Sequence, residues 1–103
     1  PNYNDALAAQ DRRRAEIAFR RYFKVAKRSD RHDIIICHGN LIRFFITLVL
    51  KADPSSWVRM DLANCGISQV LIQPEGDMAL LCHNDWSHLP KELRTSTLRP
   101  PEK

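Results

Sequence analysis

The chain has 103 residues, of which 44% are hydrophobic, and a formal net charge of +4. This length and composition suit a single globular domain, near the lower size limit for a self-sufficient α/β core, and argue against a disordered chain. No apolar run is long enough to cross a bilayer, so any contact with a membrane would need a segment that this sequence does not contain.

The first part of the chain predicts one amphipathic helix from Asp5 to Arg28. Apolar side chains recur at helical spacing between residues 15 and 26, so one face is apolar and the basic residues face solvent. Such a basic face could attract nucleic acid or anionic lipid. However, the sequence contains no aromatic stacking pattern, zinc-finger spacing or helix-turn-helix turn. We therefore interpret it as a solvated face and expect no nucleic-acid partner.

The run Ile34–Cys37 is β-branched and apolar without alternation, which predicts a strand buried on both faces, as in a parallel sheet under helices. A second helix is expected over Leu41–Lys51, and a short helix or turn starts at Asp53-Pro54. Two strands, Gly66–Gln73 and Met78–Cys82, flank a turn and predict a β-hairpin.

The expected order is thus helix, buried strand, helix, short helix and β-hairpin, followed by an irregular tail over residues 91–103. No linker, repeat or low-complexity tract divides residues 1–103, so they form part of one α/β layered domain. A single strand of the parallel type needs neighbours on both edges, so we expect the rest of the sheet to lie outside this sequence.

Cysteine usage indicates the compartment. The three cysteines are Cys37, Cys65 and Cys82, an odd number without a CxxC pair. Each lies in or beside an apolar run, which predicts reduced, buried thiols in an intracellular or matrix-like compartment and no disulfide framework or zinc site.

The junction His38-Gly39-Asn40 lies where the predicted buried strand ends and the next helix begins. Ligands gather at the carboxyl ends of strands in open α/β sheets, and a helix N-terminus there suits a phosphate. Gly39 allows close approach of the backbone, His38 can donate a hydrogen bond to a phosphoryl oxygen, and Asn40 can cap the helix or reach the anion. From the residues alone, a phosphate site and an ordinary strand-end histidine with an N-cap asparagine are equally open.

Three other histidines and two arginines have other expected roles. His32, in Arg31-His32-Asp33, precedes the predicted strand and is expected on a surface loop. We expect His88 to hydrogen-bond to a neighbouring backbone group. A metal site from His38, His83 and His88 has no carboxylate spacing to support it, so no metal is expected. Arg43 and Arg59 are interpreted as exposed, salt-bridging helix residues.

A family resemblance favours the phosphate site. His38-Gly39-Asn40 followed by Leu41-Ile42-Arg43 resembles the second histidine motif of the histidine phosphatase superfamily, the phosphoglycerate-mutase-like proteins. Three other segments are similar to that family in the same order: residues 14–23, 57–68 and 84–90. The helix before the motif most resembles the mitochondrial branch that dephosphorylates phosphoserine and phosphothreonine in proteins.

The resemblance implies a three-layer α/β/α phosphoglycerate-mutase-like fold, of which this chain would be the C-terminal half. It also implies phosphomonoester hydrolysis through a phosphohistidine, without metal or organic cofactor. His38 would be the second, catalytic histidine and would line the phosphate pocket with Gly39 and Asn40. No Arg-His-Gly occurs in the chain. The nucleophile, the phosphate arginines and the general acid are therefore expected upstream of Pro1, and the chain alone is expected to be inactive.

The expected substrate is a phosphorylated protein or a small phosphomonoester, and the resemblance allows a mitochondrial location. The alternative function is a non-catalytic phosphate-binding or protein-interaction module. Because Ile34–Cys37 would present an unpaired apolar edge, we also expect the chain to associate with itself or with the N-terminal half of the domain. The physiological substrate is not determined by the sequence.

Overall fold

The computed structural model describes residues 5–96, with side chains from residue 8 onward. Its elements are α1 (Asp5–Tyr22), α2 (Gly39–Leu50), the 3₁₀ helix η1 (Pro54–Arg59), β1 (Ile67–Ile72), β2 (Met78–Asp85) and the 3₁₀ helix η2 (Lys91–Leu93). Helices and a two-stranded antiparallel sheet confirm the α/β class and are consistent with part of a phosphoglycerate-mutase-like fold. The tail expected to be irregular starts with η2, and its residues 97–103 lie outside the described range.

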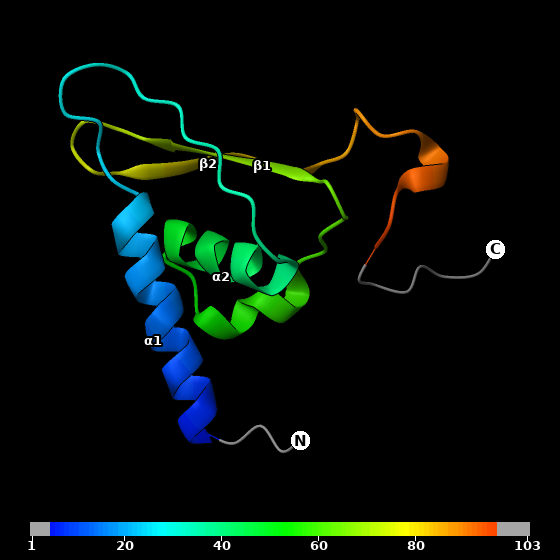
Figure 1. The fold of residues 1–103 in the computed structure, drawn as a ribbon, viewed down its shortest axis with the longest axis horizontal. Coiled ribbons are helices and arrows are strands. Elements are labelled where there is room, and N and C mark those ends of the chain that lie inside the picture. The colour runs from blue at the N-terminus through cyan, green and yellow to red at the C-terminus, as the bar shows by residue number, and fades with distance from the viewer. Residues whose placement is uncertain (1–4, 97–103) are drawn as a thin grey trace.

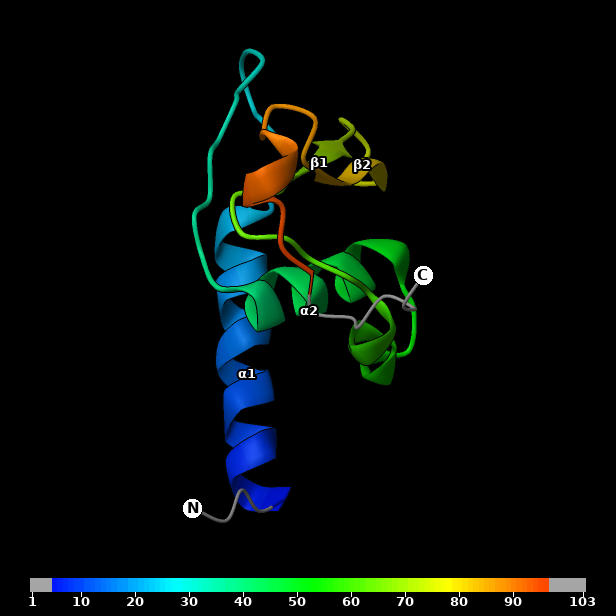
Figure 2. The same cartoon turned by 90° about the vertical axis from the view of Figure 1, so that its right-hand side faces the viewer.

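Helix α2 is the centre of the molecule. Its sequence is apolar on nearly every side, which is typical of a helix that is buried all round. The hairpin β1–β2 lies over one side of α2, η1 lies under the opposite side, and α1 crosses it (Figures 1 and 2). The buried apolar residues come from α2 and the segment before β1: Phe45, Ile46, Val49, Leu62 and Ala63.

Three phenyl rings join α1 to α2. Phe19 and Phe23 stack with ring centroids 4.4 Å apart, and Phe45 packs against them at 5.9 and 5.2 Å respectively. Helix α1 ends at Tyr22, although the sequence predicted a helix to Arg28. Basic residues crowd the following segment, and helices of this length depend on packing for stability, so the helix does not extend into the segment beyond Phe23, the last of the three packed rings.

The predicted hairpin is confirmed, and its second strand runs three residues beyond Cys82, to Asp85. Ile72 pairs with Met78 next to the turn, and Ile67 pairs with Asp85 at the far end. The turn is closed by hydrogen bonds from Gln73 N to Asp77 O and from Gly76 N to Gln73 O, at 2.8 and 2.9 Å. Gly76 has a φ of 99°, a conformation that glycine adopts without steric cost.

The buried strand predicted at Ile34–Cys37 is wrong for this chain. These residues belong to an arm, residues 23–38, that joins α1 to α2 and forms no strand. Ile34 and Ile36 are 89% and 92% exposed. The arm overlaps the hairpin in Figure 1 but stands apart from it in Figure 2. A β-branched run becomes a buried strand only where other strands pair with it, and none pairs with it among residues 5–96.

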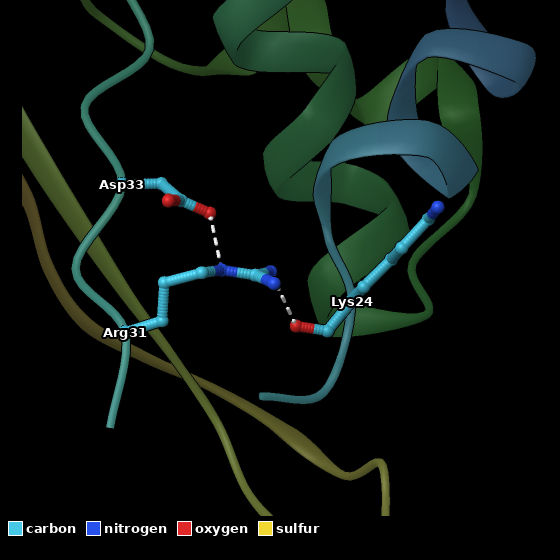
Figure 3. A network of polar contacts seen from close by, with 3 residues as sticks. All are labelled: Lys24, Arg31 and Asp33. Carbon is cyan, nitrogen blue, oxygen red and sulfur yellow. Dashed lines mark hydrogen bonds and ion pairs between the residues drawn. The ribbon is translucent and has the colours of Figure 1, made fainter. Parts of the chain in front are cut away.

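The side chain of Arg31 forms two hydrogen bonds within the arm. Arg31 donates from Nε to Asp33 Oδ2 at 3.0 Å and from a terminal nitrogen to the Lys24 carbonyl at 3.2 Å (Figure 3). All three residues are exposed. Such a pair is worth little in water, so it closes a local loop without anchoring the arm to the helices or to the hairpin.

The described part of the chain is extended and thin. Its radius of gyration is 15.4 Å, against about 13 Å for a compact domain of this length, and its extents are 51 × 38 × 20 Å. Within residues 5–96, no helix has the length and apolar character needed to span a membrane. Because a thin shape buries few side chains, the small core around α2 carries most of the stability.

Replacing Phe45 tests that core. Phe45 is 5% exposed and is the ring of α2 that contacts Phe19 in α1 and Phe23 just after α1. We expect Phe45→Ala to cost about 3–5 kcal/mol and to abolish the cooperative urea unfolding transition. Leu50→Ala is the matched control on the same helix, because Leu50 is 51% exposed. It should shift the free energy of unfolding by no more than about 0.5 kcal/mol. Equal effects of the two changes would contradict this account.

Candidate functional site

His38, Gly39 and Asn40 lie together at the start of α2, as the sequence predicted. His38 is the N-cap in extended conformation, with a φ of −82° and a ψ of 157°, and its side chain makes no capping hydrogen bond. The first hydrogen bond of the helix runs from Ile42 N to His38 O at 3.0 Å. The N–H groups of residues 39–41 precede that bond, and α2 has no acidic residue in its first turn. The helix start can therefore accept an anion.

Gly39 lies close to the loop before β1. A Cβ added at this position would be 3.1 Å from Leu62 Cδ2, so a larger residue would press on a buried side chain. The His38 side chain is exposed. The backbone of the helix start is thus held against the core while the imidazole remains accessible to a ligand.

Asn40 does not cap the helix, which corrects one of its two expected roles. It lies inside the first turn, and its Oδ1 accepts a hydrogen bond from a terminal nitrogen of Arg43, one turn further along. The other expected role, contact with an anion, stays a prediction.

Arg43 was expected to be exposed, and this is wrong. Arg43 is only 9% exposed. Its guanidinium carbon lies 5.0 Å from the centroid of the Trp57 ring, and a terminal nitrogen donates to Met60 O at 3.1 Å. In the part of the chain that the structure describes, its buried Nε has no hydrogen-bond partner. Arg59, by contrast, is exposed as expected. Since α2 is apolar nearly all round, it offers Arg43 no solvated face, and this signal was present in the sequence.

Helix η1, which carries Trp57, begins as the sequence predicted. Asp53 is its N-cap, and the carboxylate accepts hydrogen bonds from Ser55 N at 2.9 Å and Ser55 Oγ at 2.8 Å. Both bonds lower the pKa of Asp53 because they stabilise its charged form, and the bond from the Ser55 backbone has the larger effect. This cap fixes where η1 starts and so where Trp57 meets Arg43.

The segment from Asp61 to Gly66, between η1 and β1, is held by polar side chains that follow in the sequence. His83 Nε2 lies 2.9 Å from Asp61 O, and His88 Nε2 lies 2.8 Å from Cys65 O. The expected backbone contact of His88 is therefore confirmed. Further bonds join Thr95 Oγ1 to Asn64 N at 2.9 Å and Ser96 Oγ to Asp61 Oδ2 at 2.7 Å. This loop carries the residues that pack against Gly39.

Asn84 also bonds that loop. Its Oδ1 accepts from Ala63 N at 2.8 Å, and its backbone is left-handed, with a φ of 57°. A Cβ added at Gly66 would clash with this same Oδ1 and lie 3.1 Å from Ala63 O. Position 66 is thus restricted to glycine while Asn84 keeps its bond.

The other residues considered from the sequence are His32 and the three cysteines. His32 is exposed on the arm beside the Arg31–Asp33 pair. The three thiols are free, but they are less buried than predicted: Cys65 is exposed, and Cys37 and Cys82 are half-buried. Among residues 5–96, no group of three or more ligating side chains could hold a metal ion.

The chain resembles known proteins both as a family and as individual sequences. The family model "Histidine phosphatase superfamily (branch 1)" matches residues 6–85. The mitochondrial serine/threonine-protein phosphatase Pgam5 of Caenorhabditis elegans is 39% identical over 80 residues, covering 75% of this chain and 28% of that protein. The human protein of that name is 35% identical over 89 residues, covering 84% and 31%, and that of Xenopus tropicalis is 35% identical over 96 residues, covering 90% and 34%. The chain thus spans about a third of the length of these relatives.

Thiol reactivity tests the surroundings of the helix start, because Cys37 immediately precedes His38. Burial raises the pKa of the Cys37 thiol, which reduces the reactive thiolate at a given pH. We therefore expect iodoacetamide at pH 8 to modify the exposed Cys65 first and Cys37 only at higher pH, as measured by peptide mass spectrometry. Urea should remove the difference. Native Cys37 reacting as fast as Cys65 would show that its surroundings are more open than described.

Proposed function

We propose that this chain, which belongs to the histidine phosphatase superfamily, contributes the second half of a phosphatase site. The complete domain hydrolyses phosphomonoesters through a phosphohistidine, with serine/threonine phosphoproteins as substrates and mitochondria as the location. The names of the relatives support the substrate and the location. The observation that carries the proposal is the helix start at His38, where the N–H groups of residues 39–41 precede the first helical hydrogen bond and the first turn has no acidic residue.

In this proposal His38, Gly39 and Asn40 bind the phosphoryl group without metal or organic cofactor. A nucleophilic histidine outside these 103 residues attacks phosphorus, and the leaving oxygen takes a proton from an acid that also lies outside them. The His38 imidazole and the N–H groups of the helix start stabilise the charge on the phosphoryl oxygens. Because the chain contains no Arg-His-Gly, it does not turn over phosphomonoesters by itself.

An NMR titration of the 103-residue chain with phosphate or vanadate tests the site. We expect weak, saturable binding that shifts the His38 imidazole resonances and the backbone amides of residues 39–41, because these groups face the anion. His32 and His83 serve as internal controls, since one lies on the arm and the other is bonded to Asp61 O. Shifts at His32 and His83 without any at His38 would place the anion elsewhere and refute the proposed site.

A second function uses the same site without catalysis: a module that holds a phosphorylated or acidic partner. The accessible His38 side chain favours it, since that group could serve binding alone. The two functions differ in the sequence of the gene upstream of Pro1. An Arg-His-Gly that follows an apolar strand there supports the phosphatase, and its absence supports the binding module.

The exposed run Ile34–Ile36 also leads us to propose association, either of two copies of this chain or of this chain with the N-terminal half of the domain. The side chains of Ile34 and Ile36 are almost fully exposed, and extended apolar segments with unpaired backbone groups recruit other strands. We expect sedimentation at low micromolar concentration to show species larger than a monomer. Ile34→Lys with Ile36→Lys should restore the monomer, whereas Lys substitutions at Arg12 and Arg13 should not. A wild-type monomer with a sharp thermal transition would contradict association.

A further inference from the structure

The hydrogen bond between Arg43 and Asn40 fixes the orientation of the Asn40 carboxamide. A guanidinium group only donates hydrogen bonds, so the atom of Asn40 that faces it must be the oxygen, and the contact is to Oδ1. The carboxamide is planar, with Nδ2 on the opposite side of Cγ from Oδ1. The two Nδ2 hydrogens therefore point away from Arg43, and the Asn40 side chain is exposed to solvent.

Arg43 is itself held rigidly. Its guanidinium stacks on the Trp57 ring at 5.0 Å, a terminal nitrogen donates to Met60 O at 3.1 Å, and the residue is 9% exposed. The spacing of three residues along α2 brings Arg43 and Asn40 to the same side of the helix. Asn40 is consequently attached to a buried group that joins α2, η1 and the loop after η1.

We propose that Arg43 is a positioning residue of the anion site, which holds Asn40 Oδ1 so that Asn40 Nδ2 donates to a phosphoryl oxygen. The inference rests on the proposed phosphate binding by His38, Gly39 and Asn40. Arg43 acts through Asn40 and not on the anion itself: the residue is only 9% exposed, and each of its terminal nitrogens already donates one hydrogen bond, to Asn40 Oδ1 and to Met60 O.

A competing explanation is that Arg43 attracts the anion only by its charge. The two explanations differ for Arg43→Lys, which keeps the charge. A lysine ammonium is a compact point donor and cannot stack as a plane on Trp57 while bonding Met60 O and Asn40 Oδ1. Under positioning, Arg43→Lys weakens binding. Under charge alone, it leaves the affinity unchanged.

The test is a double-mutant cycle in which phosphate binding to the 103-residue chain is monitored by ¹H–¹⁵N NMR. In the wild type, the Asn40 Nδ2 resonances should shift with the same saturation curve as those of His38. Arg43→Lys and Asn40→Ala should each weaken phosphate binding about tenfold, the value of one hydrogen bond to a charged group. The double variant should bind no more weakly than Asn40→Ala alone, since Arg43 acts through Asn40. Additive losses would overturn the inference.

Arg94→Lys is the matched control for loss of a stacked arginine. Arg94 lies over the Trp86 ring at 5.4 Å and donates from Nε to Leu89 O at 3.1 Å, so it has the same kinds of contact far along the chain from Asn40. Its replacement should leave phosphate affinity unchanged. A tenfold loss in Arg94→Lys would show that the titration reports general loosening and would remove the support from Arg43→Lys.

If Arg43→Lys does not fold, Trp57→Leu replaces it in the cycle. This change removes the ring under the guanidinium and keeps an apolar side chain at a half-buried position. It should weaken phosphate binding severalfold in the presence of Asn40 and not at all in the Asn40→Ala background. Unchanged affinity in Trp57→Leu would overturn the inference.

The failure of this inference is distinguishable from failure of the proposed function. Absence of any phosphate-induced shift at His38 in the wild type refutes the anion site itself. A shift at His38 with unmoved Asn40 Nδ2 resonances keeps the anion site and removes the role of Asn40 and Arg43.

Discussion

Burial of α2 on nearly all sides is the constraint on which the rest of the structure depends. The helix packs against α1, η1 and the strand β2. Phe45 joins it to Phe19 of α1 and to Phe23 just after α1, and Arg43 joins it to Trp57 of η1. The start of the same helix forms the candidate anion site. Any change that loosens α2 therefore acts on stability and on the site together.

The elements that the sequence predicted well are those determined by neighbouring residues. Asp53-Pro54 begins η1 because the carboxylate bonds Ser55, and the hairpin forms around a turn in which Gly76 adopts a positive φ. The run Ile34–Cys37 was mispredicted because its apolar pattern describes a strand inside a larger sheet. Burial there depends on partner strands, and a run of residues carries no information on whether partners are present.

The position of the candidate site was predictable, but the contacts of Arg43 that hold Asn40 were not. The order of an apolar run, His38-Gly39-Asn40 and an apolar helix was enough to place the anion site at a helix start, where the structure puts these residues. Arg43 was missed because a charged residue in a helix is usually exposed. The apolar surroundings within α2 indicated its burial, but its contact with Trp57 was not predictable, because pairs of residues from different elements meet only in the folded chain.

The contact between Gly66 and Asn84 has a consequence for how this sequence can change over evolutionary time. A side chain at position 66 would collide with Asn84 Oδ1, which accepts a hydrogen bond from Ala63 N. The backbone of Asn84 is left-handed. Loss of Asn84 would remove the nearest obstacle, although Ala63 O would remain at 3.1 Å, and it would also remove the bond to the loop. The two positions are therefore epistatic: a side chain at 66 requires Asn84 either to give up its bond to Ala63 or to have been replaced already, so the order of mutations matters.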